Sequence, residues 1–171
     1  MTSPPAGPYR VCLVCMGNIC RSPMAEAVLC RQLAEAGLRD AVAVDSAGTG
    51  GWHEGDDADE RARAVLTAHG YTLRHRARRF RADWFSRYDL VLALDGANMA
   101  DLRRLAPDAD TADRIRLLRS YDPASTGQLD GELGVPDPYY GDGDGFAHVL
   151  RLVEAACRGL VEELRGEVVH R

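Results

Sequence analysis

The sequence predicts an α/β fold in which helices cover both faces of a parallel β-sheet. Short apolar runs alternate along the chain with longer segments whose apolar residues recur at helical spacing. This alternation is typical of strand–helix–strand units, which build parallel sheets. The chain has 171 residues, enough for one domain, and no internal repeat or linker divides it. We expect a loose tail over residues 1–8 and a single domain over residues 9–166.

The first expected unit is a strand–helix–strand unit. An apolar run at residues 11–14 predicts a buried strand, and Ala41–Asp45 predicts a second strand. The helix between them is expected to have Ser22 as its N-cap and Pro23 in its first position. Gly37 is expected to end this helix, because glycine readily takes the left-handed conformation after a helix.

The middle of the chain repeats this order. Asp57 and Glu60 resemble a capping box, which predicts a helix that ends at Gly70. Leu90–Leu94 predicts a third buried strand, and a helix is expected over Asn98–Leu105.

The last third contains one more expected strand, a loop and a long helix. Ile115–Leu118 predicts the strand, and the Gly- and Asp-rich stretch 122–145 predicts a surface loop. Apolar residues from Phe146 to Leu164 then recur on one face of an amphipathic helix.

Composition and charge restrict the classes of function. The net charge of -5 gives no electrostatic basis for nucleic acid binding, and no apolar run reaches the roughly 18 residues that a membrane span needs. Five cysteines, an odd number, argue against a secreted disulfide scaffold, and residues 1–8 lack the pattern of a signal peptide. The cysteines and histidines are too scattered to predict a metal site. We expect a cytoplasmic protein whose thiols are reduced, with neither nucleic acid nor a membrane as partner.

The loop between the first strand and the first helix is the strongest candidate site. Ligands of open parallel sheets bind beyond the carboxyl ends of the strands, where this loop is expected to lie. Its backbone N–H groups and the helix dipole would bind an anion such as phosphate. The candidate phosphate-binding residues are Met16, Gly17, Asn18, Ile19, Cys20, Arg21 and Ser22.

The same loop carries a candidate nucleophile. A helix N-terminus and a nearby arginine favour the thiolate form of a cysteine, so Cys15 is expected to attack phosphorus and form a phosphocysteine. Arg21 would bind two phosphate oxygens with its planar guanidinium. Two roles are open for the Ser22 hydroxyl: it caps the helix, or it donates to the Cys15 sulfur.

A downstream carboxyl group is the candidate proton donor. Asp137 lies between Pro136 and Pro138, which restrict the backbone and would preorganise the acid. It would protonate the leaving phenolate and then accept a proton from water. Asp122 also precedes a proline, but it lacks the Pro-Tyr-Tyr sequence that follows Asp137.

Three segments resemble the low-molecular-weight protein tyrosine phosphatase family, in its bacterial form. They are C-M-G-N-I-C-R-S-P-M-A-E, D-S-A-G-T-G-G-W-H-E-G and D-P-Y-Y-G, with weaker matches at H-R-A-R-R-F and L-A-L-D-G-A-N. The resemblance covers about residues 10–165. It implies a three-layer doubly wound sandwich with a four-stranded parallel sheet, no metal and no cofactor. It also implies hydrolysis of phosphotyrosine in proteins or peptides, with inorganic phosphate as the product.

The resemblance also implies roles for individual residues. It makes Cys15 the nucleophile, Arg21 the phosphate clamp and Asp137 the general acid and base. It implies a polar network that supports the loop, formed by Asn18, Ser22, Ser46 and His75. It implies an aromatic cleft deep enough for a phenyl ring, with walls from Trp52, Tyr139 and Tyr140.

Three residues refine this interpretation. Ile19 favours an aromatic phosphoester, because the similar phosphoarginine phosphatases carry threonine there. Glu54 is expected at the cleft, where it would favour substrates with basic neighbours. Cys20 has two readings, a packing residue or the partner of a reversible disulfide that protects Cys15.

Two other functions compete with phosphotyrosine hydrolysis. A thioredoxin-coupled arsenate reductase shares this fold, but it needs a downstream cysteine pair, and beyond Cys30 the chain has only Cys157. A non-catalytic phosphopeptide-binding module would not need all three catalytic positions, which are present here.

Overall fold

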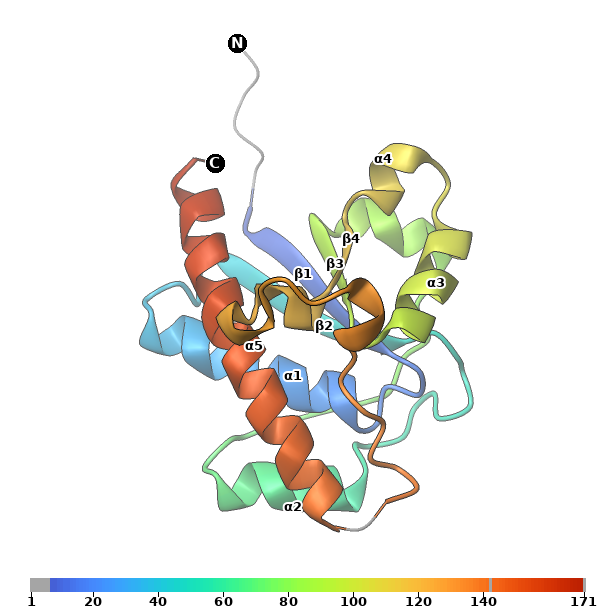
Figure 1. Ribbon diagram of the computed structural model, residues 1–171, viewed down its shortest axis with the longest axis vertical. Coiled ribbons are helices and arrows are strands. Elements are labelled where there is room, and N and C mark those ends of the chain that lie inside the picture. The colour runs from blue at the N-terminus through green and yellow to red at the C-terminus, as the bar shows by residue number, and fades with distance from the viewer. Residues whose placement is uncertain (1–6, 142, 171) are drawn as a thin grey trace.

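The computed structural model describes residues 7–141 and 143–170, and these residues form one α/β sandwich (Figure 1). Of the tail expected over residues 1–8, only Gly7 and Pro8 fall within the described residues. No helix of the described part of the chain is both long and apolar enough to cross a membrane.

The described residues form a four-stranded sheet in which every pairing is parallel, as the sequence predicts. The strand order is β2-β1-β3-β4, so β1 and β3 are the inner strands. Residue Cys12 pairs with Asp45 on one side and with Val91 on the other, which sets the register of the three longest strands. The strands are β1 (Tyr9–Cys15), β2 (Val42–Gly48), β3 (Leu90–Ala93) and β4 (Ile115–Leu117).

Helices cover both faces of this sheet (Figure 1). The α-helices are α1 (Arg21–Glu35), α2 (Glu60–Ala68), α3 (Gly96–Leu105), α4 (Ala109–Ala112) and α5 (Gly143–Val169). Short 3-10 helices are η1 (Ala82–Arg87), η2 (Leu118–Tyr121), η3 (Pro123–Ser125) and η4 (Asp130–Glu132). The last two lie within the stretch 122–145 that the sequence predicts as loop, and α5 begins before that stretch ends.

The buried residues of the described chain form two apolar clusters, one on each face of the sheet. Strand side chains alternate between them, so Leu13 packs with α1 and α5 while Val14 packs with α3 and η1. The first cluster is the larger, and it includes Val135 from the segment before α5. Strand β1, whose carboxyl end leads into the candidate loop, is therefore packed on both faces.

The expected helix starts are wrong at three places, and local hydrogen bonding explains each. Helix α1 begins at Arg21 rather than Pro23, and Ser22 makes no capping bond because its hydroxyl turns toward Cys15. Asp59, not Asp57, caps α2 by accepting a hydrogen bond from Arg61 N. Helix α3 begins two residues before Asn98, because the Asp95 side chain accepts a hydrogen bond from Asn98 N. Each start depends on which of several polar side chains reaches the backbone N–H.

Candidate active site

The candidate phosphate loop connects the carboxyl end of β1 to the first turn of α1. Asn18 adopts a left-handed conformation with φ 57, which asparagine tolerates better than most residues. In the described chain, none of the backbone N–H groups of residues 16–20 donates to a protein acceptor. These N–H groups, together with the N-terminus of α1, are available to bind an anion.

A buried polar network holds the loop in this shape. The Asn18 amide donates to Ser22 Oγ at 2.8 Å and to Ser46 Oγ at 3.0 Å. Its Oδ1 accepts from Arg78 N at 2.9 Å. Burial lowers the pKa of His75, so its ring is neutral at pH 7 and Nε2–H donates to Asn18 O at 2.6 Å. The four residues expected to support the loop, Asn18, Ser22, Ser46 and His75, are thus brought together.

Ser22 links this network to the candidate nucleophile. Because Asn18 already donates to the Ser22 oxygen, the hydroxyl proton is free to point elsewhere. Cys15 Sγ lies 3.0 Å from Ser22 Oγ, closer than Ala47 O at 3.4 Å. The hydroxyl is therefore placed to donate to a thiolate on Cys15.

The neighbouring strand end approaches the loop so closely that it requires glycine. A Cβ added at Gly48 would lie 2.7 Å from Met16 O and 3.1 Å from Asn18 N. The backbone just beyond β2 donates to the loop, from Thr49 N to Cys15 O and from Gly50 N to Met16 O, each at 2.9 Å. Any side chain at Gly48 would displace the phosphate loop itself.

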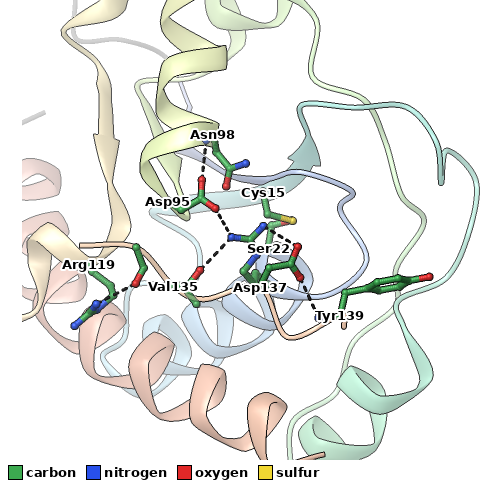
Figure 2. Close-up of polar contacts among 10 residues, drawn as sticks. Cys15, Ser22, Asp95, Asn98, Arg119, Val135, Asp137 and Tyr139 are labelled. Atoms are coloured by element: carbon green, nitrogen blue, oxygen red, sulfur yellow. Dashed lines mark hydrogen bonds and ion pairs between the residues drawn. The ribbon is translucent and has the colours of Figure 1, made fainter. Parts of the chain in front are cut away.

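Arg21 is buried at the base of the site, where three groups fix its guanidinium. Nη1 donates to Asp95 Oδ2 at 2.6 Å and to Val135 O at 3.1 Å, and Nη2 lies 3.6 Å from Asp137 Oδ2. Burial lowers the pKa of Arg21, but the nearby Cys15, Asp95 and Asp137 outweigh this and raise it. The guanidinium therefore keeps its charge between Asp95 and Asp137. Figure 2 shows these two carboxylates on the same side of the site as the Cys15 sulfur.

Asp95 is a site residue that the sequence reasoning missed. It accepts from Asn98 N with one oxygen and from Arg21 with the other, so the N-cap of α3 also orients the Arg21 guanidinium. Figure 2 shows Asp95 between Asn98 and the site. Its position just beyond β3, at the carboxyl edge of the sheet, is the signal that would have identified it.

The candidate acid lies across the site from the phosphate loop. Asp137 Oδ1 accepts from Tyr139 N at 3.0 Å, which fixes the carboxyl group in the turn after Pro136. Its other oxygen faces Arg21, and about a third of the side chain is exposed (32%). The acid is thus within reach of a group bound over the loop and of water.

The three expected catalytic residues line one cleft of about 340 Å³. Its rim is aromatic, with Trp52 74% exposed and Tyr140 87% exposed. Tyr139 and Tyr140 pack edge to face with their ring centroids 4.9 Å apart. His53, which sequence reasoning did not assign, also lines the cleft, and its ring centroid lies 6.5 Å from that of Tyr139. The other lining residues are Met16, Gly17, Ile19 and Cys20.

Glu54 does not line this cleft with the other expected residues. Its Oε1 accepts from Arg79 N at 3.3 Å and lies 3.7 Å from Arg81 Nη2. The carboxylate is therefore paired with a basic segment beside the loop that carries Trp52.

The remaining cysteines differ from Cys15 in their surroundings. Cys12 and Cys157 are fully buried in the two apolar clusters, where burial raises the pKa of each thiol. Cys20 lines the cleft, and burial, followed by the charge of Asp59, raises its pKa to about 12. A thiol with that pKa is protonated at pH 7, so Cys20 does not compete with Cys15 as a nucleophile.

A cysteine, an arginine and an aspartate around one anion-binding loop define the class of cysteine-dependent phosphatases. The family model described as low molecular weight phosphotyrosine protein phosphatase matches residues 10–170. The chain is 59% identical to a low molecular weight protein-tyrosine-phosphatase of Streptomyces coelicolor, over 95% of this chain and 98% of the relative. It is 50% identical to low molecular weight protein-tyrosine phosphatase A of Mycobacterium tuberculosis, over 90% of each chain.

A solved structure agrees with the sequence comparison. A protein tyrosine phosphatase from Entamoeba histolytica superimposes with a TM-score of 0.86 at 34% identity, covering 93% of this chain and 98% of that chain. The chain belongs to the low-molecular-weight phosphotyrosine protein phosphatase family. Both the fold and the family that the sequence predicts are thereby confirmed.

Proposed function

We propose that the protein hydrolyses phosphotyrosine in proteins and peptides through a phosphocysteine on Cys15 and releases inorganic phosphate. The observation that carries this proposal is the convergence of the Cys15 sulfur, the Arg21 guanidinium and the Asp137 carboxyl on one cleft. Family membership and the names of the relatives support the same reaction.

In the first step, the phosphoryl group binds over the phosphate loop. The backbone N–H groups of residues 16–20 and the Arg21 guanidinium hold its oxygens, and they stabilise the charge that develops in the transition state. The Cys15 thiolate attacks phosphorus, forming the S–P bond as the bond to the tyrosine oxygen breaks. Asp137, in its protonated form, gives its proton to that oxygen, which leaves as a neutral phenol.

In the second step, water replaces the sulfur. The Asp137 carboxylate accepts a proton from water, whose oxygen attacks phosphorus, and the S–P bond breaks to release phosphate. The Ser22 hydroxyl, 3.0 Å from the sulfur, stabilises the thiolate that leaves. Asp95 holds the guanidinium in place throughout, because it binds Nη1 and leaves Nη2 directed toward the cleft.

The cleft supports an aryl phosphate as substrate. The aromatic rim formed by Trp52, Tyr139 and Tyr140 would flank a phenyl ring, while the phosphate reaches Cys15 at the base. Ile19 offers an apolar contact on the same surface, which favours a phenyl ring over a charged guanidinium. The alternatives, phosphoarginine hydrolysis and thioredoxin-coupled arsenate reduction, receive no such support.

We place the reaction in the cytoplasm, where proteins phosphorylated on tyrosine would be the partners. A thiolate mechanism needs Cys15 reduced, and the cytoplasm keeps thiols in that state. Neither a membrane nor a nucleic acid has a part in this mechanism.

The decisive activity test is release of p-nitrophenol from its phosphate ester at mildly acid pH. Wild type is expected to turn over, and Cys15→Ser is expected to be inactive. Equal inactivity of the two proteins would overturn the proposal. Asp137→Ala should slow phenyl esters far more than esters with good leaving groups, by roughly 10²–10⁴ for the poor ones. Asp137→Ala is also the form with which phosphorylated partners can be captured.

We also propose that Cys20 protects Cys15 from irreversible oxidation. Peroxide would convert the Cys15 thiolate to a sulfenic acid, and the Cys20 thiol would then form a disulfide with release of water. Both residues line the same cleft, which supports such a pairing. Cys20→Ala should recover less activity after peroxide and a thiol reductant than wild type, and unchanged recovery would refute the pairing.

A further inference from the structure

Arg119 makes a set of contacts for which the chemistry above provides no role. It belongs to η2, which directly follows β4, and its Nη1 donates to Gly134 O at 3.0 Å and to Glu132 O at 3.3 Å. Figure 2 shows Arg119 beyond Val135, on the side away from Cys15. The segment that leads to the candidate acid is therefore bound by one arginine at Gly134 and by another, Arg21, at Val135.

The backbone between these contacts and Asp137 is short and stiff. Val135 is fully buried, and its N–H donates to Leu94 O at 2.7 Å. Gly134 packs against Asp95, since an added Cβ would lie 3.4 Å from the Asp95 Cβ. Only Pro136, whose φ is fixed by its ring, separates Val135 from Asp137. A shift of the backbone at Gly134 is consequently carried into the position of the Asp137 carboxyl.

The partners of Arg119 are unusual for an arginine. The side chain is partly buried, yet none of the carboxylate side chains that the structure describes lies within 4.0 Å of its guanidinium. Its Nε is buried and has no acceptor among the described residues. The two acceptors found among the described groups are backbone carbonyls of the segment before Asp137. The described contacts of the guanidinium therefore tie η2 to the backbone of this segment.

We propose that Arg119 is a positioning residue for the general acid. By binding the Glu132 and Gly134 carbonyls, it holds the segment against the sheet edge so that the Asp137 carboxyl reaches the leaving oxygen. This role rests on the proposed phosphatase function and extends it, because it acts through Asp137 and leaves phosphate binding unchanged. Removal of Arg119 should therefore lower kcat/KM most for substrates with poor leaving groups, which depend most on protonation by the acid.

The test compares kcat/KM for phenyl phosphate, a poor leaving group, with that for 2,4-dinitrophenyl phosphate, a good one. R119Q is expected to lower the first about tenfold and the second less than about twofold, since a displaced acid matters only for the poor leaving group. R119K, which keeps a donor, should lie between R119Q and wild type for phenyl phosphate. R116Q is the matched control, because it removes the same charge from an exposed residue of β4, and it should behave as wild type.

A double-mutant cycle distinguishes positioning from a general structural effect. In the Asp137→Ala background, R119Q should have no further effect on kcat/KM for phenyl phosphate, because the acid is already absent. Equal losses for both esters in R119Q, or an additive loss in the double variant, would overturn the assignment. If R119Q does not fold, R119K carries the same comparison, and a loss in R119K that is equal for both esters would also overturn it. An inactive wild type would overturn the phosphatase function itself, whereas an active wild type with an unselective R119Q overturns only the role of Arg119.

Discussion

Replacing Asp95 tests how far the phosphate clamp depends on one carboxylate. Asp95→Asn removes the charge that faces Arg21 but keeps a side chain that caps helices equally well, so α3 should still begin at Gly96. Asp95→Ala removes both the charge and the cap. The two variants therefore separate the ion pair from the helix start.

The burial of the two side chains sets the expected loss in the free energy of unfolding. The Arg21 side chain is only 4% exposed and the Asp95 side chain is 27% exposed, so the pair lies between a buried and a surface ion pair. Breaking a fully buried pair costs about 3–5 kcal/mol, and surface pairs are worth about 0–1 kcal/mol. We expect Asp95→Asn to lower the free energy of unfolding by about 2 kcal/mol, intermediate between these limits. Asp95→Ala should lose about 1 kcal/mol more, the usual value of an N-cap.

Urea unfolding and steady-state kinetics measure the two effects. Asp95→Asn is expected to let the Arg21 guanidinium shift, and a displacement of about 1 Å can reduce kcat/KM about 10²-fold. We therefore expect a loss of that size in kcat/KM for Asp95→Asn. Asp101→Asn is the control, since it makes the same chemical change in α3 at an exposed pair with Arg104 and should cost less than about 0.5 kcal/mol. If Asp95→Asn matched wild type in both stability and kcat/KM, the dependence of the clamp on Asp95 would be refuted.

Three further predictions concern the loop, an acidic side chain of α1 and the ion pair of Glu54 with Arg81. Gly48→Ala should leave the fold intact by circular dichroism but reduce kcat/KM about 10²-fold, because its Cβ would displace Met16 O. Burial raises the pKa of Glu26 from 4.5 to about 7, so the folded state binds more protons than the unfolded state between these values. The free energy of unfolding therefore falls as the pH rises across this window. Glu26→Gln should reduce the difference between the free energies measured by urea unfolding at pH 5 and pH 8. Glu54→Gln should leave Arg81 unpaired and raise kcat/KM for acidic phosphopeptides about two- to fivefold relative to basic ones; an unchanged ratio would contradict this.

The strands and the nucleophile loop could be predicted because their signals are local. Buried strands of a parallel sheet appear as short apolar runs, and the expected strand Leu90–Leu94 begins with the observed β3 and extends only one residue beyond it. Cys15 and Arg21 lie close together in the sequence, between a buried strand and a helix, so the sequence indicates them together as candidates. Asp137 could be proposed as the acid because two flanking prolines and two tyrosines distinguish it from other loop carboxylates.

The supporting residues could not be predicted in the same way. Asp95 is 74 positions from Arg21 in the chain, and only the sheet brings them within 2.6 Å. Arg119 is one of 21 basic residues, and no local feature distinguishes it before its contact with Gly134 is known. The expected helix starts differ from the observed ones because Ser22 contacts Cys15 and Asp57 accepts from Ala58 N instead of capping a helix. Long-range polar contacts, rather than local propensity, account for what was missed.

The central claim is that the Cys15 sulfur carries the phosphoryl group during turnover. Acid quenching of the enzyme during hydrolysis of an aryl phosphate, followed by mass spectrometry of its peptides, measures this directly. We predict one phosphoryl group on the peptide that contains Cys15, and none in Cys15→Ser under the same conditions. A phosphoryl group on any other residue, or continued turnover by Cys15→Ser, would contradict the mechanism.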